Sequence, residues 1–279
     1  MSLTIPLGMY GLLGPKGAGK SALMRILAKV QAPDAGSIHL GATDLLGRNE
    51  DIRSALAYLP QERGVYPQLS AENLLEYFAM LKGFPQRGGG RGAVVEALLR
   101  RTRLWESRKQ KLGACPVGVR QRFGLAVALL CNPKLVIVDE PTAGLEPADG
   151  ACFLNLLSSL AENCIVILST SVVGDVGRLC KKMAIMDHGE ILLEAAPGSA
   201  IANLRGRIWC RTVLRDALPA LARRHLVLST CPAGAGVVVR VISDSAPDAA
   251  FLAAEPTLDD VYAHVIAGRR AGRAGDGPV

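Results

Sequence analysis

Residues 14–21, GPKGAGKS, constrain the fold of this chain more than any other segment. The three glycines let the backbone curl so that successive N–H groups face one point, and Lys20 adds a positive charge at the start of the next helix. The apolar run GMYGLL precedes the segment and the helical pattern SALMRILAKV follows it. This order predicts a strand, a phosphate-binding loop and a helix, with Ser21 supplying a hydroxyl for a divalent cation.

Short apolar runs alternate with helical patterns through residues 1–205, as expected for βα units around a mostly parallel sheet. The predicted strands are GMYGLL, SIHL, ALAYLP, KLVIVD, CIVILS and KMAIMD. Helical patterns near 71–82, 93–104 and 119–131 indicate an insertion, broken by the glycine-rich stretch FPQRGGGRG at 84–92. The sequence therefore predicts a three-layer α/β fold with a helical subdomain at about 70–131.

The pattern changes after Leu204 to the runs RIWCRTV, HLVLST and GVVVRVI, with proline and glycine between them. These short runs predict a small α+β appendage that has its own strands. We therefore expect a main domain over residues 1–205 and an accessory domain over residues 206–279.

Composition excludes several classes of protein. The longest apolar stretches, such as LAVALLC at 125–131, are far shorter than the roughly 18 to 20 residues that span a bilayer, and the N-terminus has no basic region typical of a signal peptide. The seven cysteines occur singly, without the CxxC pairs of a zinc or redox site. The net charge of +7 permits contact with acidic lipid or nucleic acid, but solvated helix faces and a loose terminus are the favoured explanation. These features predict a cytoplasmic chain with no membrane span.

A second group of residues points to chemistry on a phosphate. The run LVIVDE at 135–140 places two acidic residues at the end of an apolar strand, where ligands bind in α/β sheets. Asp139 can hold the shell of Mg²⁺, and Glu140 can orient or deprotonate an attacking water. A strand that ends in two acids is weak evidence alone, but combined with the upstream loop it indicates phosphoryl transfer.

These motifs resemble the ATP-binding subunit of an ABC transporter, of the ABC-2 exporter type that includes the daunorubicin-resistance ATPases. The segment GPKGAGKS resembles Walker A, YLPQE at 58–62 the Q-loop, LVIVDEPTAGLEP at 135–147 Walker B and the D-loop, and PTLDDVYAHV at 256–265 the C-terminal end of the subfamily. The resemblance implies a P-loop NTPase fold, with ATP and Mg²⁺ as cofactors. It also implies a separate integral membrane permease of ABC-2 type, a second ATP-binding subunit in a homo- or heterodimer, no nucleic acid, and a place at the inner face of the plasma membrane.

The resemblance also implies roles for individual residues. Those expected to hold ATP are Gly14, Pro15, Lys16, Gly17, Ala18, Gly19, Lys20, Ser21, Ala22 and Gln61. Ser21, Gln61 and Asp139 are expected to hold Mg²⁺, and Glu140 is the expected catalytic residue. Gln61 is also expected to report the nucleotide state to the permease through the helical insertion, although a lone glutamine otherwise indicates only solvated surface.

The segment CPVGVRQR at 115–122 departs from the family signature LSGGxxQR, which in the family clamps ATP from the second subunit. Pro116 lacks the hydroxyl and the N–H of the family serine, and Val117 puts a branched side chain where glycine lets the backbone approach the phosphate. Each lost donor is expected to cost roughly 3 kcal/mol, or about a hundredfold in rate.

Further departures affect the chain's own nucleotide site. Ser171 stands where the family has a histidine that reaches the γ-phosphate, and Glu146 replaces the D-loop aspartate. Residues 1–13 offer Tyr10 as an aromatic side chain, and we expect it in the core instead of against adenine. We therefore expect binding of ATP to be retained while its hydrolysis is impaired.

Two functions remain open at this point. One is an ATP-binding and ATP-hydrolysing subunit that energises export through a separate permease; the other is a catalytically silent nucleotide-binding module that regulates or scaffolds a complex. Ribosome-acting and DNA-repair relatives are disfavoured because they carry tandem ATP-binding domains or long coiled coils. A small GTPase is disfavoured because the chain lacks an NKxD motif.

Overall fold

The larger sheet of the computed structural model, which describes residues 1–47, 51–61, 64, 66–86 and 90–275, has the strand order β4-β5-β6-β1-β7-β8. Its strands are β1 (Gly8–Leu13), β4 (Leu56–Leu59), β5 (Leu135–Asp139), β6 (Ile165–Thr170), β7 (Lys182–Asp187) and β8 (Glu190–Ala195). β4, β5 and β6 are mutually parallel, whereas β8 pairs antiparallel with β7. Every residue of β1 and β5 is buried, as expected for strands covered on both faces.

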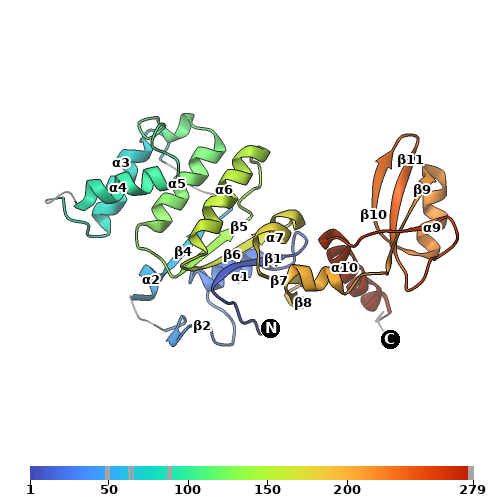
Figure 1. Cartoon of the computed structure of the whole chain (residues 1–279). Helices are drawn as coiled ribbons and strands as arrows, with labels where there is room; N and C mark the ends of the chain where they lie inside the picture. Colours follow the sequence, from blue (N-terminus) through green and yellow to red (C-terminus); the bar gives the residue numbers. More distant parts are fainter. Residues whose placement is uncertain (48–50, 62–63, 65, 87–89, 276–279) are drawn as a thin grey trace. The chain divides into compact units, whose positions relative to one another are not determined.

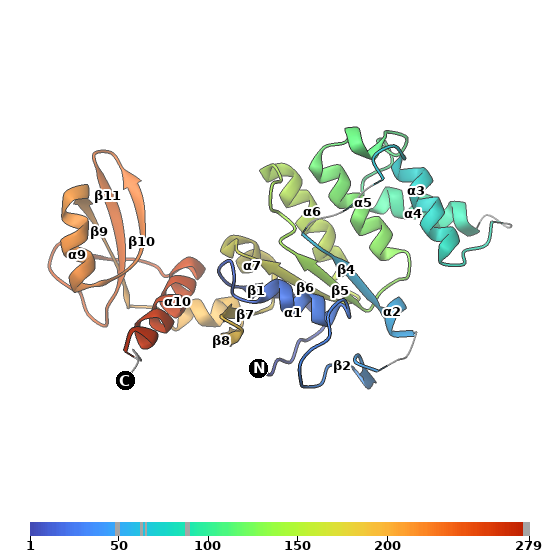
Figure 2. The same cartoon turned by 180° about the vertical axis from the view of Figure 1, so that it is seen from behind.

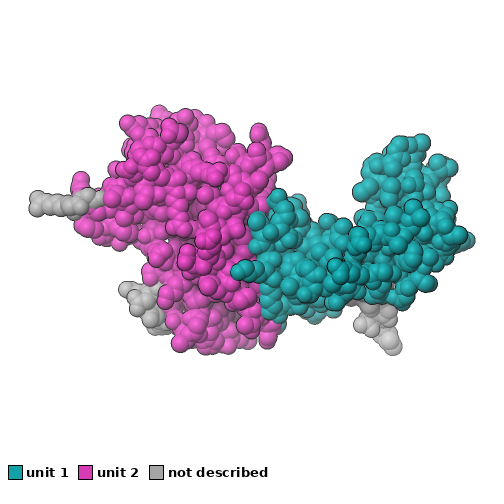
Figure 3. Space-filling model, in the orientation of Figure 1, with its two compact units in different colours: residues 1, 13–18, 172–279 teal, residues 2–12, 19–171 magenta. Residues whose placement is uncertain are grey.

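The chain divides into two units, which Figure 3 shows in different colours: residues 2–12 with 19–171, and residues 1 and 13–18 with 172–279. The first unit contains α1 (Lys20–Leu27), α2 (Asp51–Ala55), α3 (Ala71–Leu81), α4 (Gly90–Arg101), η2 (Leu112–Ala114), α5 (Val117–Leu129) and α6 (Pro147–Leu160). Within it α5 and α6 lie on one side of strands β4 to β6, and α1 lies on the other, as Figure 1 shows and Figure 2 repeats from behind. The predicted three-layer α/β fold is therefore confirmed.

Helices α3, α4 and α5 form the predicted helical insertion. Ser70 begins α3 as its N-cap residue, since its hydroxyl accepts a hydrogen bond from the Asn73 N–H at 3.3 Å. Helix α4 begins at Gly90, within the glycine-rich stretch, where the sequence predicted a start near residue 93. Residues 87–89 of that stretch lie outside the described residues.

The predicted strand SIHL does not join the larger sheet. Only β2 (His39–Leu40) forms there, and it pairs antiparallel with β3 (Thr43–Asp44) in a separate ribbon. Most of the ribbon is exposed. It therefore buries too few apolar side chains to stabilise strands longer than two residues.

The second unit contains a four-stranded sheet with the order β10-β11-β9-β12. Besides β7 and β8 of the larger sheet, the elements of this unit are α7 (Val173–Leu179), α8 (Pro197–Ala202), β9 (Ile208–Leu214), η3 (Arg215–Ala217), α9 (Leu218–Arg224), β10 (Leu226–Ala233), β11 (Gly236–Ile242), β12 (Leu252–Ala253) and α10 (Leu258–Gly275). Buried valines of β9 and β11 pack around Phe251, and Leu218 and Leu221 of α9 pack against this core. The predicted α+β character of the C-terminal segment is thus confirmed, with α9 and β12 in addition to the three predicted strands.

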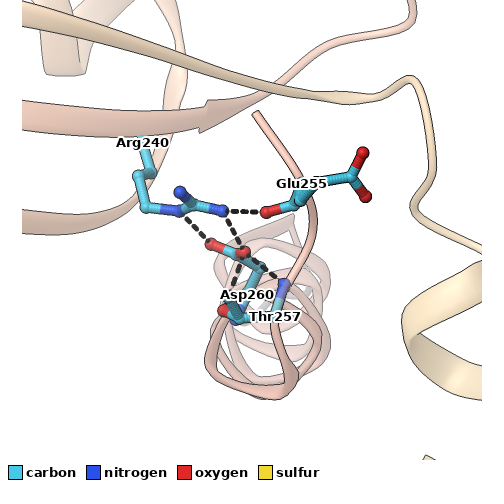
Figure 4. A network of polar contacts seen from close by, with 4 residues as sticks. All are labelled: Arg240, Glu255, Thr257 and Asp260. Atoms are coloured by element: carbon cyan, nitrogen blue, oxygen red, sulfur yellow. Dashed lines mark hydrogen bonds and ion pairs between the residues drawn. The ribbon is translucent and has the colours of Figure 1, made fainter. Parts of the chain in front are cut away.

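An ion pair links α10 to the C-terminal sheet (Figure 4). The Arg240 guanidinium on β11 donates to both carboxylate oxygens of Asp260, at 2.9 and 2.7 Å, and to the Glu255 carbonyl oxygen at 2.7 Å. The Thr257 N–H and hydroxyl also donate to Asp260, so the carboxylate has four donors and is only 1% exposed. Helix α10 also packs against α7 and α8 of the same unit, so it contacts these two helices as well as the C-terminal sheet.

Candidate nucleotide-binding site

The predicted phosphate-binding loop connects β1 directly to α1. A Cβ on Gly14 would collide with the Met186 carbonyl oxygen, so only glycine fits there. Gly17 and Gly19 have φ values of 83° and 99°, which favour glycine because other residues are strained at positive φ. The Ala18 N–H donates to the Pro15 carbonyl oxygen at 3.2 Å, which closes the turn. The loop therefore has the curled backbone that the sequence predicts.

Lys20 begins α1 and points its ammonium group toward Glu140. The Lys20 Nζ lies 3.5 Å from Glu140 Oε1, and the two side chains are 6% and 15% exposed. Burial strengthens a charge pair because water screens it less. The structure thus pairs the lysine that is predicted to bind phosphate with the glutamate that is predicted to be catalytic.

Glu140 follows β5 with a φ of 45°, which is uncommon for a residue with a side chain. Its N–H donates to the Ser169 carbonyl oxygen at 2.9 Å, so the turn remains attached to β6. Its Oε2 accepts from the Ser171 N–H at 3.3 Å and from the Ser171 hydroxyl at 3.4 Å. Three donor groups from two residues therefore surround the Glu140 carboxylate.

Asp139 is the last residue of β5 and is 2% exposed. Among the described residues, its Oδ1 has no hydrogen-bond partner, which is costly for a buried carboxylate oxygen. Burial and then the charge of Asp139 raise the pKa of the neighbouring Tyr58 hydroxyl. An unpaired anionic oxygen of this kind suits a hard cation such as Mg²⁺, which prefers oxygen ligands.

The other predicted ligands lie in the loop, in the first turn of α1 and after β4. Ser21 and Ala22 occupy the first turn of α1 and are partly exposed, while Lys16 is exposed in the loop. Gln61 is exposed two residues after β4, whose last residue Leu59 pairs with Val138 of β5. Because β4 and β5 are parallel, Gln61 and Asp139 follow the same edge of the sheet. The role of Gln61 as a ligand of Mg²⁺ stays a prediction.

The degenerate signature segment forms the start of α5. Pro116 is its N-cap residue, with φ −55° and ψ 158°, and provides no side-chain hydrogen bond to the helix. Val117 is 41% exposed. A Cβ on Gly118 would meet the Asp149 carboxylate at 2.5 Å, and Arg122 Nη1 pairs with Asp149 Oδ1 at 3.0 Å. The retained glycine and arginine thus hold α5 against α6.

Sequence reasoning missed two contacts. The sequence indicated only that Ser171 replaces the family histidine, whereas in the structure Ser171 donates two hydrogen bonds to Glu140. It gave Asp149 no role, although the Asp149 carboxylate contacts two residues of the signature segment, Gly118 and Arg122. The helical spacing of the signature could have suggested a partner for Arg122, but no local pattern identifies which acid that is. Tyr10 is 1% exposed, which confirms its predicted place in the core.

None of the helices within the described ranges is both long and apolar enough to cross a membrane. The same part of the chain contains no cluster of three or more histidine, cysteine or acidic residues that could form a metal site by itself.

The family model described as ABC transporter matches residues 1–143. A probable multidrug ABC transporter ATP-binding protein of Escherichia coli (strain K12), YbhF, is 29% identical over 273 residues, which cover 92% of this chain and 47% of that protein. The Nod factor export ATP-binding protein I of Paraburkholderia xenovorans (strain LB400) is 33% identical over 229 residues, which cover 77% of this chain and 72% of that protein. The chain therefore spans about half the length of the first relative and most of the second.

Solved structures show the same fold. An ATP-binding subunit of an ABC transporter aligns with a TM-score of 0.61 and 25% identity, over 71% of this chain and 82% of that one. A dimeric ATP-binding cassette bound to ADP and Pi aligns with a TM-score of 0.62 and 22% identity, over 70% of this chain and 88% of that one. Together with the loop, the acidic pair and the helical insertion, these matches establish that the chain belongs to the ABC transporter family, among its ATP-binding proteins.

Proposed function

We propose that this chain hydrolyses ATP to drive export through a separate integral membrane permease of ABC-2 type. The observation that carries the proposal is the largely buried pair of Lys20 and Glu140 directly after Asp139, whose Oδ1 is buried and has no hydrogen-bond partner in the described chain. A site that only stored nucleotide would not need an acid placed against the phosphate-binding lysine.

The chain's own residues supply three steps of this reaction. The loop N–H groups and Lys20 bind the phosphates, since they form an anion site at a helix N-terminus. Glu140 orients the attacking water and accepts its proton as the bond between the γ-phosphorus and the leaving oxygen of ADP breaks. Before nucleotide binds, Glu140 neutralises Lys20, so the phosphates must replace this carboxylate at the ammonium group.

We propose Ser21, Gln61 and Asp139 as the residues that hold Mg²⁺. Asp139 fits a cation because its buried Oδ1 lacks a partner in the described part of the chain, and Ser21 fits because its hydroxyl lies in the first turn after the loop. Mg²⁺ bound between these side chains and the nucleotide would neutralise the charge that develops on the phosphates.

An exposed apolar surface supports a protein partner. We call it the α3 surface; it consists of Tyr77, Met80 and Leu81, which share one face of α3 by their i, i+3, i+4 spacing and are 46% to 60% exposed. Apolar side chains that gather on one element mark an interaction site more often than scattered ones do. We propose that the permease covers the α3 surface, which would place the chain at the inner face of the plasma membrane.

We also propose that two ATP-binding subunits associate, as in the dimeric cassette that shares the fold. In such a dimer residues 1–205 act as the nucleotide-binding domain and residues 206–279 as an accessory domain. The signature segment would then face the nucleotide of the other subunit, and its Pro116 and Val117 would slow that site.

Steady-state ATPase activity of the purified chain, alone and with its cognate permease in lipid nanodiscs, tests the proposal. We expect Mg²⁺-dependent turnover that the permease stimulates and that Glu140→Gln abolishes. The matched control is Glu162→Gln, which removes an exposed acid between α6 and β6, away from the site. Failure to bind ATP at millimolar concentration would exclude the proposal, and binding without turnover would favour the silent module instead.

A further inference from the structure

Ser171 contacts the Glu140 carboxylate although 31 positions separate the two residues in the chain. Both its N–H and its hydroxyl donate to Oε2, at 3.3 and 3.4 Å, whereas Oε1 lies 3.5 Å from Lys20 Nζ. Each oxygen of the carboxylate therefore has its own donor. Because Oε2 accepts both hydrogen bonds from Ser171, Oε1 is the oxygen that can face the phosphates.

The backbone limits Glu140 as well. Its φ of 45° and the hydrogen bond from its N–H to the Ser169 carbonyl oxygen set the direction in which the side chain leaves the chain. Strained positive φ values persist where the surrounding structure holds them, and they concentrate at functional sites. The backbone does not fix the side-chain torsions of Glu140. The hydrogen bond from the Ser171 hydroxyl restricts them.

We propose that Ser171 is a positioning residue that holds Glu140 for its part in ATP hydrolysis; the catalytic half of this inference rests on the proposed function. In the nucleotide-free chain Ser171 keeps Oε1 on Lys20. When phosphates take Lys20, the same two donors retain Oε2 and leave Oε1 turned toward the nucleotide. Ser171 acts through Glu140 and needs no contact with the phosphate, for which its side chain is too short.

Substitutions of Ser171 show whether it positions Glu140 for catalysis or only stabilises the fold. Ser171→Ala should lower kcat about tenfold, the effect of losing one hydrogen bond to a charged group, and leave KM unchanged or lower. Ser171→Thr should restore kcat, because it keeps the hydroxyl and the exposed position has room for a methyl group. The matched control is Ser159→Ala on α6, whose hydroxyl donates only to the Leu156 carbonyl oxygen in the described chain, and it should change neither constant.

A binding experiment decides the inference even if the chain does not turn over ATP. The probe is a fluorescent ATP analogue, mant-ATP, titrated into the full chain and into the variants Ser171→Ala, Glu140→Ala and the double variant. Glu140→Ala should tighten binding because it removes the carboxylate that competes with the phosphates for Lys20, and Ser171→Ala should tighten it by a smaller factor. In the double variant Ser171→Ala should add nothing, since residues that act through one group are not additive.

The outcomes separate the two proposals. Lack of turnover combined with the expected non-additive binding would reject hydrolysis as the function and keep Ser171 as the residue that positions Glu140. An effect of Ser171→Ala that is equal with and without Glu140 would overturn the role of Ser171, whatever the turnover. So would a Ser171→Ala variant with unchanged kcat and unchanged affinity, or a Ser171→Thr variant as impaired as the alanine.

Discussion

Gly14 is the loop residue whose replacement the structure tolerates least. A methyl group there would meet the Met186 carbonyl oxygen, and it would also lie 3.1 Å from the Ala18 side chain. We expect Gly14→Ala to lower the free energy of unfolding by about 2 kcal/mol, the usual cost of forcing a group into a packed site. The displaced loop should also bind ATP more weakly, since its N–H groups no longer converge. Urea unfolding and a nucleotide titration measure both effects.

Gly198→Ala is the control for that substitution. Gly198 lies in α8 of the same unit, and no atom lies within 4 Å of an added Cβ. Replacing a helical glycine with alanine there should raise stability by about 0.5 to 1 kcal/mol. Equal effects of the two substitutions would contradict the steric argument for Gly14.

At the same scale, the sequence could predict Lys20, Asp139 and Glu140 because each belongs to a local motif whose chemistry needs that residue type. It could not predict that Ser171 binds Glu140. That contact depends on the φ of 45° at Glu140 and on the pairing of Asp139 with Ser169 across β5 and β6. Neither property is encoded near Ser171, so only the folded chain brings the two side chains together.

At the scale of elements, burial explains which strands the sequence could predict. The runs GMYGLL and GVVVRVI match β1 and β11 residue for residue because long apolar stretches are buried there. β8 was missed because its residues are exposed or half-buried and alternate only weakly. Its position depends on the turn before it, where His188 and Gly189 have φ values of 47° and 79°. A turn of this kind reverses the chain and makes β8 antiparallel to β7.

The link between β11 and α10 depends on one buried carboxylate. Burial opposes the ionisation of Asp260, but the hydrogen bonds from Arg240 and Thr257 outweigh it and hold the Asp260 pKa below its ordinary value. Removing one partner of a buried pair leaves the other uncompensated. We therefore expect Asp260→Asn to lower the free energy of unfolding of the C-terminal sheet by about 3 kcal/mol at pH 7.

The sign of the pH dependence follows from the lowered pKa. Stability from the Asp260 carboxylate is fully present above the pKa of an unfolded aspartate, about 3.9, and is lost as the pH falls through the lower pKa of the folded chain. The stability difference between wild type and Asp260→Asn should therefore shrink below about pH 4. Trp209 fluorescence, measured in a Trp105→Phe background, reports this sheet because Trp209 lies in β9. A difference that stays constant down to pH 2 would contradict the ion pair's role.

At the scale of the whole molecule, the α3 surface predicts how the chain meets its permease. Met80→Glu combined with Leu81→Glu puts two charges on side chains that are 46% and 60% exposed, so folding should hardly change. Association with the permease should weaken at least about tenfold, since buried charges without partners oppose binding. Co-purification from membranes measures this. Leu214→Glu, at a residue 69% exposed on β9, is the control and should leave association intact.

The proposed dimer also predicts that activity can be raised. Pro116→Ser with Val117→Gly returns a hydroxyl, an N–H and close backbone access to the start of α5, while Gly118 and the Arg122 pair with Asp149 keep the helix in place. Restored donors should raise kcat by at least about a hundredfold, the effect of one preorganised contact to the developing charge. Because these donors serve the nucleotide of the second subunit, the test mixes unmodified chain with a chain that carries Pro116→Ser, Val117→Gly and also Glu140→Gln, so that its own site cannot hydrolyse ATP. This mixture should turn over ATP faster than either chain alone, because the restored donors of the triple variant act on the intact site of the unmodified chain. Absence of that gain, with both chains folded, would show that α5 does not act across an interface.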